Sequence, residues 1–219
     1  MNCPHGIVMN NIFFTLQRFC FRLSRLHRRC GYHVHSPFAF ELITQVIYEK
    51  KAYYAYKELE VGQRKQMRMF GTEDKRVEFQ KVNRLLLRLV NKAQPETIVD
   101  AGMLSYSALY LQAGKPSANY VSASGLTDLF LEKDVPVDFL YLHDYKNLAL
   151  MEEIFQVCVA RVREQSMFVI EGIGYSKQMR MFWKRLMADK RVEITFDLYD
   201  VGILCFDKTK VKQHYQIYF

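Results

Sequence analysis

Glycine and proline are scarce in this sequence, and it contains no low-complexity tract and no internal repeat. The 219 residues include 10 glycines and 5 prolines, whereas half of the residues are hydrophobic. This composition excludes a disordered chain, because it supplies enough apolar surface to offset the entropy lost on folding. The length suits one compact domain with an extension better than two full domains.

The sequence also lacks the cysteine pattern of a secreted protein and any long apolar run. Its five cysteines are odd in number and widely spaced, which indicates free thiols in a reducing compartment. The most apolar stretch near the start, residues 12–26, is interrupted by Arg18, Arg22 and Arg25. These charges argue against a signal peptide and against a membrane-spanning helix. We therefore expect a cytoplasmic protein.

Positive charge is concentrated in the N-terminal part of the chain. The net charge is +8, and residues 1–92 hold 17 Lys+Arg against 7 Asp+Glu, leaving 14 against 16 for the remainder. We expect residues 1–92 to form a basic helical extension and residues 93–219 to form an α/β core, together in one compact domain.

Within the extension, residues 12–30 place apolar side chains at helical spacing beside a stripe of arginines. Two interpretations remain open: this helix packs on the main domain, or it lies on an anionic membrane surface. We do not expect nucleic acid as a partner, because no recognisable nucleic-acid-binding fold accompanies the basic residues. The nearby His27, Cys30, His33 and His35 lack the spacing of a standard zinc site.

Further along, helix signals and short apolar runs alternate in the manner of an α/β protein. Ser36 and Pro37 mark a helix start, and residues 77–90 follow a helical pattern that Pro95 ends. Strands are predicted over residues 97–100, 119–123, 137–142 and 167–170, with helices over 105–112, 148–162 and 177–187. The runs 192–198 and 203–206 are joined so closely that they must pair antiparallel. The alternating run 214–219 extends this hairpin or mediates a dimer.

The predicted fold is a Rossmann-like sheet, mostly parallel and closed by a C-terminal hairpin. From about residue 32 onward the chain resembles the class I S-adenosylmethionine-dependent methyltransferases, especially the small O-methyltransferase branch. The segments that carry this resemblance are His35-Ser36-Pro37-Phe38, Arg88-Leu89-Val90-Asn91, Asp100-Ala101-Gly102, Ser107-Ala108-Leu109-Tyr110-Leu111, Asp138-Phe139-Leu140-Tyr141-Leu142, Glu171-Gly172-Ile173, Asp197-Leu198 and Gly202-Ile203-Leu204. It implies S-adenosylmethionine as cofactor and methyl transfer to the hydroxyl or amine of a small molecule.

The resemblance also implies where the cofactor would be bound. It assigns cofactor contacts to Asp100, Gly102, Ser105, Ser107 and Ser124. The chain departs from the family pattern, because only Gly102 remains of the glycine-rich turn and Ser124 stands where an acid would accept the ribose hydroxyls. The distance from Gly125 to Asp138 leaves room for one short helix but not for the third, edge strand. We therefore expect a degenerate member of the family.

The acids and the histidine at the strand ends are the candidate catalytic residues. His143, Asp144 and Glu171 should converge with Asp100 on the crevice where open α/β sheets bind ligands. His143 or Asp144 would act as general base. The alternative is that Asp144 and Glu171 only cap the helices that follow them. A metal-assisted mechanism needs a third ligand where Gly172 stands, so we predict no metal site.

Two hypotheses about function therefore remain open. In the first, the protein is a methyltransferase that holds its cofactor through altered contacts. In the second, it has lost the cofactor and is a non-catalytic binding or scaffold module on a methyltransferase fold.

Overall fold

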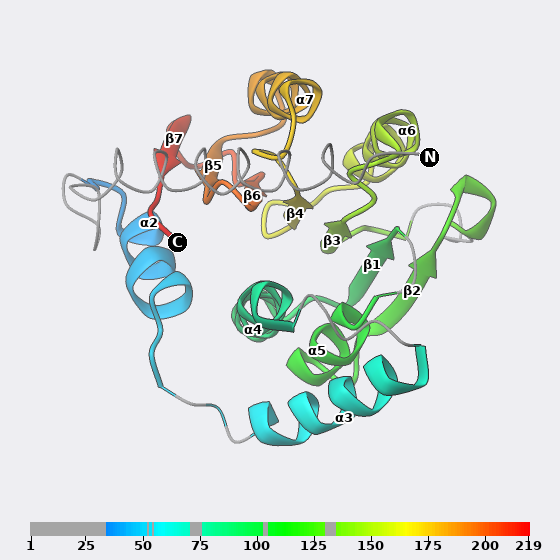
Figure 1. Ribbon diagram of the computed structural model, residues 1–219. Coiled ribbons are helices and arrows are strands. Elements are labelled where there is room, and N and C mark those ends of the chain that lie inside the picture. The colour runs from blue at the N-terminus through cyan, green and yellow to red at the C-terminus, as the bar shows by residue number, and fades with distance from the viewer. Residues whose placement is uncertain (1–33, 52, 54, 71–75, 103–104, 130–134) are drawn as a thin grey trace, which may run out of the picture.

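The computed structural model describes residues 34–51, 53, 55–70, 76–102, 105–129 and 135–219, and helices cover both faces of one sheet (Figure 1). The strands are β1 Thr97–Ala101, β2 Asn119–Ala123, β3 Phe139–Leu142, β4 Met167–Glu171, β5 Ile194–Asp197, β6 Val201–Cys205 and β7 Gln213–Gln216. They lie in the order β2-β1-β3-β4-β6-β5-β7. This arrangement confirms the predicted α/β class.

Most of the strand pairs are parallel. β1 pairs in parallel with β2 and β3, and β3 with β4, whereas β6 runs antiparallel to both β4 and β5. The predicted terminal hairpin is therefore present as β5 and β6. β7 adds to the sheet beyond this hairpin by pairing in parallel with β5. At the opposite edge lies β2, and the described residues between Gly125 and Asp138 contain only the 3₁₀ turn η4, Leu126–Asp128, and no third strand.

The first face of the sheet is covered by α6, Leu148–Val159, and α7, Lys177–Ala188. Their apolar side chains pack against every second residue of the central strands, including Val99, Leu140 and Phe168. This follows from the two periodicities, because alternate strand residues point to one face and helical residues three and four apart share a stripe.

On the second face lie α2, Pro37–Glu41, the π-helix η2, Leu42–Ile47, and α4, Arg76–Ala93. Their buried side chains share one core with the other alternate strand residues, such as Ile98, Phe139 and Val169. The helix α5, Ser107–Gly114, lies beside α4 and reaches the same core through Leu111. The helix α3, Ala55–Phe70, packs outside α4 and α5 through Tyr56, Leu87 and Tyr110. α3 therefore forms a third layer (Figure 1).

The N-terminal elements are fixed by a helix cap and by one buried arginine. Ser36 caps α2 as predicted, since its hydroxyl oxygen accepts a hydrogen bond from the backbone N–H of Ala39. Arg88 is 7% exposed and donates to the carbonyls of Val46 and Ile47, at the end of η2, and to the hydroxyl of Tyr56. Its guanidinium thus satisfies carbonyls that a helix end leaves unpaired.

The predicted helix of residues 12–30 and the cysteine and histidine cluster up to His33 lie outside the described residues. No helix in the described part of the chain is both long enough and apolar enough to cross a membrane.

Candidate functional site

The candidate residues gather at the carboxyl ends of β1, β3 and β4. In these parallel strands Asp100 lies beside Tyr141, and Tyr141 beside Val169. Residues two positions apart on a strand point to the same face, so Asp100, Tyr141, His143 and Glu171 all lie on the α4 side of the sheet. Strand register alone therefore brings together three of the four strand-end residues predicted to converge.

Asp100 is almost fully buried, and the side chains of Tyr120 and His143 lie against its carboxylate. The hydroxyl of Tyr120, on the adjacent strand β2, donates to its Oδ2 atom. The Nε2 atom of His143 lies 3.0 Å from its Oδ1 atom, but the two are not aligned for a hydrogen bond, and Oδ1 has no hydrogen-bond partner in the part of the chain described. Burial, followed by the nearby charge of Asp100, raises the pKa of Tyr120 above its ordinary value.

The imidazole of His143 lies directly against Gly102. Gly102 has a φ of +150°, and a Cβ atom at this position would lie 2.7–2.8 Å from three atoms of the ring. The ring also stacks on Tyr141, with centroids 4.7 Å apart. The backbone anchors this arrangement, because the N–H of His143 donates to the carbonyl of Ala101 at 3.0 Å. The glycine face at the end of β1 is therefore covered by a side chain of the protein itself.

Glu171, at the end of β4, is buried and joined to this stack. The hydroxyl of Tyr141 donates to its Oε2 atom. Burial raises the pKa of Glu171 above its ordinary value, and the hydrogen bond from Tyr141 opposes that rise. Burial and the charge of Glu171 also raise the pKa of Tyr141. The site is thus a chain of contacts from Tyr120 through Asp100, His143 and Tyr141 to Glu171.

Two further glycines after β4 lie under aromatic rings. Gly172 has a φ of +76°, and a Cβ atom there would lie 2.8–3.1 Å from atoms of Tyr145. A Cβ atom on Gly174 would lie 2.7–2.8 Å from atoms of Tyr199. The ring of Tyr145 packs edge-on against Tyr175, with centroids 5.0 Å apart. Gly102, Gly172 and Gly174 are consequently each in close contact with an aromatic ring of the same chain.

The serines predicted to contact a cofactor make local hydrogen bonds. Ser105 and Ser107 share a hydrogen bond between their hydroxyls, and the N–H of Ser107 donates to the Oγ atom of Ser105 at 3.2 Å, where α5 begins. Ser124 follows β2, and both its N–H and its hydroxyl donate to the Oδ2 atom of Asp128. These hydrogen bonds lower the pKa of Asp128. A carboxylate therefore does lie beside the end of β2, four residues after Ser124.

Asp144 does not join the buried cluster. Its backbone carbonyl accepts from Asn147 at 2.8 Å, and no hydrogen bond or ion pair joins its carboxylate to the described residues of the site. The helix-cap alternative is wrong for Asp144 and Glu171, because the side chains that cap α6 and α7 are Asn147 and Ser176. No group of three His, Cys, Asp or Glu side chains among the described residues is placed to hold a metal ion.

The sequence interpretation missed the tyrosines and Asp128. Tyr120 and Tyr141 were assigned only to strands, although the period of two places Tyr141 on the same face as His143. The two-residue spacing of Tyr141 and His143 could therefore have identified Tyr141 from the sequence. Asp128 carried no such signal, because its approach to Ser124 depends on the turn η4.

Comparison with known proteins gives matches by structure and none by sequence. No family model and no curated protein matches the sequence. The O-methyltransferase TomG from Streptomyces achromogenes, involved in tomaymycin synthesis and in complex with S-adenosylmethionine, is 16% identical with a TM-score of 0.50, over 71% of this chain and 90% of that one. An O-methyltransferase from Bacillus cereus in complex with S-adenosylhomocysteine is 14% identical with a TM-score of 0.51, over 71% and 92%.

The cofactor-bound protein Rv0187 from MTB is 12% identical with a TM-score of 0.51, over 78% of this chain and 97% of that one. Identities this low show the fold alone. The structural matches and the strand order together confirm the resemblance inferred from the sequence: this chain has the fold of the class I S-adenosylmethionine-dependent O-methyltransferases.

Proposed function

We propose that this protein is a non-catalytic binding module on a methyltransferase fold, with a cofactor site closed by its own side chains. The observation that carries the proposal is the contact between the His143 ring and Gly102. A glycine-rich turn serves nucleotide-type cofactors because the missing Cβ lets the ligand approach the backbone. Here an imidazole already makes that approach.

The described residues around Gly102 do not fit S-adenosylmethionine as they are arranged. The space that a Cβ on Gly102 would enter is filled by an aromatic ring, and Gly172 and Gly174 are covered in the same way. Asp100 is 4% exposed and is already engaged by Tyr120. A ligand at this edge would have to displace the His143 ring, and its stacking on Tyr141 would be lost.

A second candidate is a methyltransferase whose site opens when His143 moves away. Two observations favour it. Asp128 supplies a carboxylate at the end of β2, where the family pattern calls for an acid. The Oδ1 atom of Asp100 is buried and lacks a hydrogen-bond partner in the described structure, and such an atom gains from a donor on an arriving ligand.

Calorimetric titration with S-adenosylmethionine and S-adenosylhomocysteine separates the two candidates. If the protein is a non-catalytic binding module, the wild-type protein should bind neither ligand with a Kd below about 1 mM. Micromolar binding by the wild-type protein would overturn it. In that case Asp128→Asn should weaken binding, and Glu171→Gln should reduce turnover while leaving the fold intact.

His143→Ala tests whether the ring itself closes the site. If it does, this variant gains measurable binding of S-adenosylhomocysteine, because the space beside Gly102 becomes free. His214→Ala is the matched control, because His214 lies on the edge strand β7 rather than in the site. Binding gained equally by both variants would exclude a specific role for His143.

A further inference from the structure

Helix α7 is held on the sheet in a fixed orientation. Its buried residues are Met179, Phe182, Trp183 and Leu186, which recur at steps of three and four. A Cβ atom on Gly202 of β6 would lie 2.5–2.9 Å from three atoms of the Trp183 ring, so the indole packs directly against the strand. This close contact directs the opposite side of the helix to solvent.

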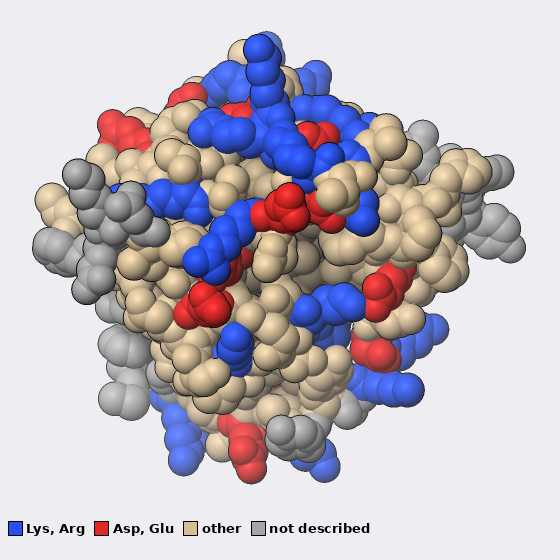
Figure 2. Space-filling model, turned by 180° about the vertical axis from the view of Figure 1, so that it is seen from behind, with Lys and Arg blue, Asp and Glu red and all other residues tan. Residues whose placement is uncertain are grey.

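That solvent side is basic. α7 contains no Asp or Glu, and its exposed residues include Lys177, Lys184 and Arg185. The loop between β6 and β7 lies against the end of the helix, because Lys208 donates to the carbonyl of Lys190 and Lys212 to that of Asp189. Figure 2 shows lysine and arginine side chains gathered at the end of the molecule where α7 lies.

We call this surface the α7 basic face. It comprises Lys177, Arg180, Lys184, Arg185, Lys190, Arg191, Lys208, Lys210 and Lys212. Carboxylate partners are few: Glu152 pairs with Arg185, Asp189 with Arg191, Glu193 with Lys208 and Asp207 with Lys210. The other five cations have no carboxylate within 4.0 Å in the described part of the chain. The net charge of this face is therefore clearly positive.

Exposed aliphatic side chains lie among these cations. Met181 is 53% exposed and sits one turn from Lys177 and Lys184 on the same side of α7. Val211 is 77% exposed between Lys210 and Lys212. The two aromatic residues of α7, Phe182 and Trp183, are instead buried, so the helix offers no ring on which a base could stack.

We propose that the α7 basic face docks on an anionic lipid surface. Lysines around exposed aliphatic side chains match a membrane interface, where the cations meet headgroup phosphates and the aliphatic groups enter the acyl boundary. A nucleic acid would use the charge but leave Met181 and Val211 without a favourable environment. This docking is independent of whether the cofactor site is open.

The test is co-sedimentation of the full chain with vesicles of phosphatidylcholine alone or mixed with phosphatidylserine. The wild-type protein should bind only the mixed vesicles, and salt should weaken binding because the attraction is electrostatic. The triple variant Lys177→Gln, Lys184→Gln, Lys190→Gln should bind on the order of 100-fold more weakly. Met181→Ser should also weaken vesicle binding, but less than the triple lysine variant does.

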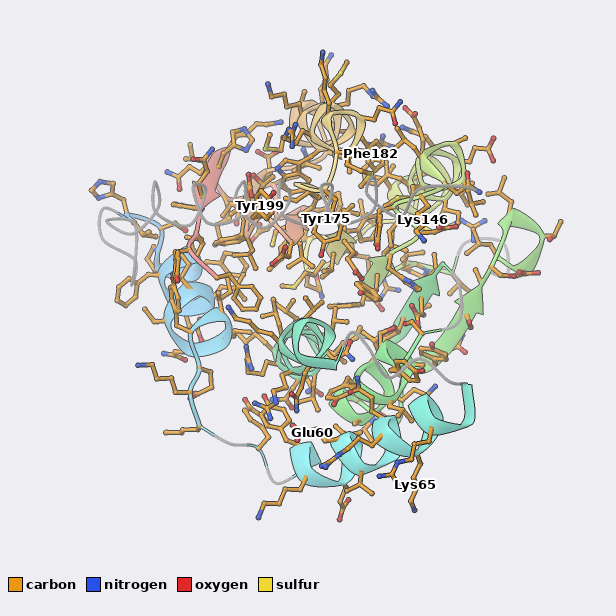
Figure 3. All side chains as sticks on the ribbon, in the orientation of Figure 1. Glu60, Lys65, Lys146, Tyr175, Phe182 and Tyr199 are labelled. Atoms are coloured by element: carbon orange, nitrogen blue, oxygen red, sulfur yellow. The ribbon has the colours of Figure 1, made fainter. Side chains whose placement is uncertain are left out.

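The matched control removes three exposed lysines from elsewhere, in Lys50→Gln, Lys57→Gln, Lys65→Gln. Lys57 and Lys65 lie on α3, and Figure 3 places Lys65 at the opposite end of the molecule from Phe182 of α7. This control has the same net charge as the first variant and should bind nearly as well as wild type.

Three outcomes would overturn the proposal. The first is equal loss in both triple variants, and the second is unchanged binding of the α7 triple variant, which would place binding elsewhere. The third is absence of vesicle binding by the wild-type protein. This outcome overturns the proposal even if the wild-type protein binds double-stranded DNA. Circular dichroism melting checks folding, and if the triple variant unfolds, Lys184→Gln alone should still weaken binding about fivefold.

Discussion

At the scale of single residues, the proposed closure of the cofactor site depends on the contact between Gly102 and His143. The backbone of Gly102 has a φ that side-chain-bearing residues rarely adopt, and the imidazole occupies the position of the missing Cβ. A side chain introduced at residue 102 would therefore suffer both backbone strain and crowding by the ring, and removing the ring by a second substitution separates the two effects.

Gly102→Ala should lower the free energy of unfolding by about 2–4 kcal/mol, because the new methyl group meets both a strained backbone and the ring. In a His143→Ala background only the strain remains, so the same substitution should cost about 1–3 kcal/mol. Urea unfolding of the wild type, the two single variants and the double variant measures the coupling free energy between residues 102 and 143. Identical costs in both backgrounds would mean that the ring is not packed on Gly102.

Tyr141→Phe should make stability more dependent on pH. The folded protein raises the pKa of Glu171 by burial, so it holds a proton more tightly than the unfolded chain. Stability is then highest below the ordinary pKa of a glutamate and falls as the pH rises through the folded pKa. The Tyr141 hydroxyl opposes this rise, and removing it extends the loss of stability to higher pH.

The measurement is the difference in Tm between wild type and Tyr141→Phe at acidic and at neutral pH. The difference should be larger at neutral pH, where the carboxylate loses a hydrogen bond worth about 1–3 kcal/mol. Glu171→Gln is the control, because it removes the titrating group and should flatten both profiles. A difference that does not change with pH would contradict the assignment.

At the scale of elements, two helical glycines show how helices are packed together. Gly114 is the last residue of α5, and its φ is not positive in the structure, so it is not needed there for a left-handed backbone. A Cβ atom there would lie 2.7 Å from side-chain atoms of Val90 on α4. Gly114 is therefore required for the close approach of α5 to α4. Gly62 of α3, by contrast, has only one ordinary neighbour, Leu109, at 3.6 Å.

Gly114→Ala and Gly62→Ala should consequently change stability in opposite directions. The first should lower the free energy of unfolding by about 1–3 kcal/mol, because it overpacks the α4–α5 contact. The second should raise it by about 0.5–1 kcal/mol, because alanine favours a helix interior over glycine. Denaturant titration of both variants checks the pair, and loss of stability in Gly62→Ala would contradict this description of α3.

Elements were also the level at which the sequence was most informative. The predicted strand 119–123 coincides with β2, and the helices at 148 and 177 begin where α6 and α7 begin. Their starts coincide because each apolar stripe has a helical period, whereas the capping side chains, Asn147 and Ser176, are not the ones that the sequence suggested. The π-helical continuation of α2 was not readable, since carbonyls at its end are bonded by Arg88, 41 and 42 residues away.

At the scale of the whole molecule, the C-terminus joins the core that the first described helices help to build. Ile217 and Phe219 are buried in one cluster with Ile43 of η2, and the hydroxyl of Tyr48 donates to the carbonyl of Tyr218. Figure 1 shows the C-terminus beside α2. Segments distant in the sequence thus depend on the same buried surface.

Ile217→Ala should lower the free energy of unfolding of the whole protein by about 2–4 kcal/mol, as expected for a large-to-small change in a core. Far-UV and near-UV circular dichroism should still report one coincident transition, because the ends share a core. Early loss of the near-UV signal would mean instead that the C-terminal strand unfolds separately.

Local patterning in the sequence was sufficient for the class of fold and for three of the strand-end residues at the site. Short apolar runs at Thr97–Ala101 and Phe139–Leu142 identify buried strands, and residues at the ends of parallel strands must meet at one edge. The packing of His143 on Gly102 and the position of Asp128 beside Ser124 required the folded structure. The physical reason is that a side chain's direction and its neighbours depend on strand register and on turns, which involve segments far apart in the chain.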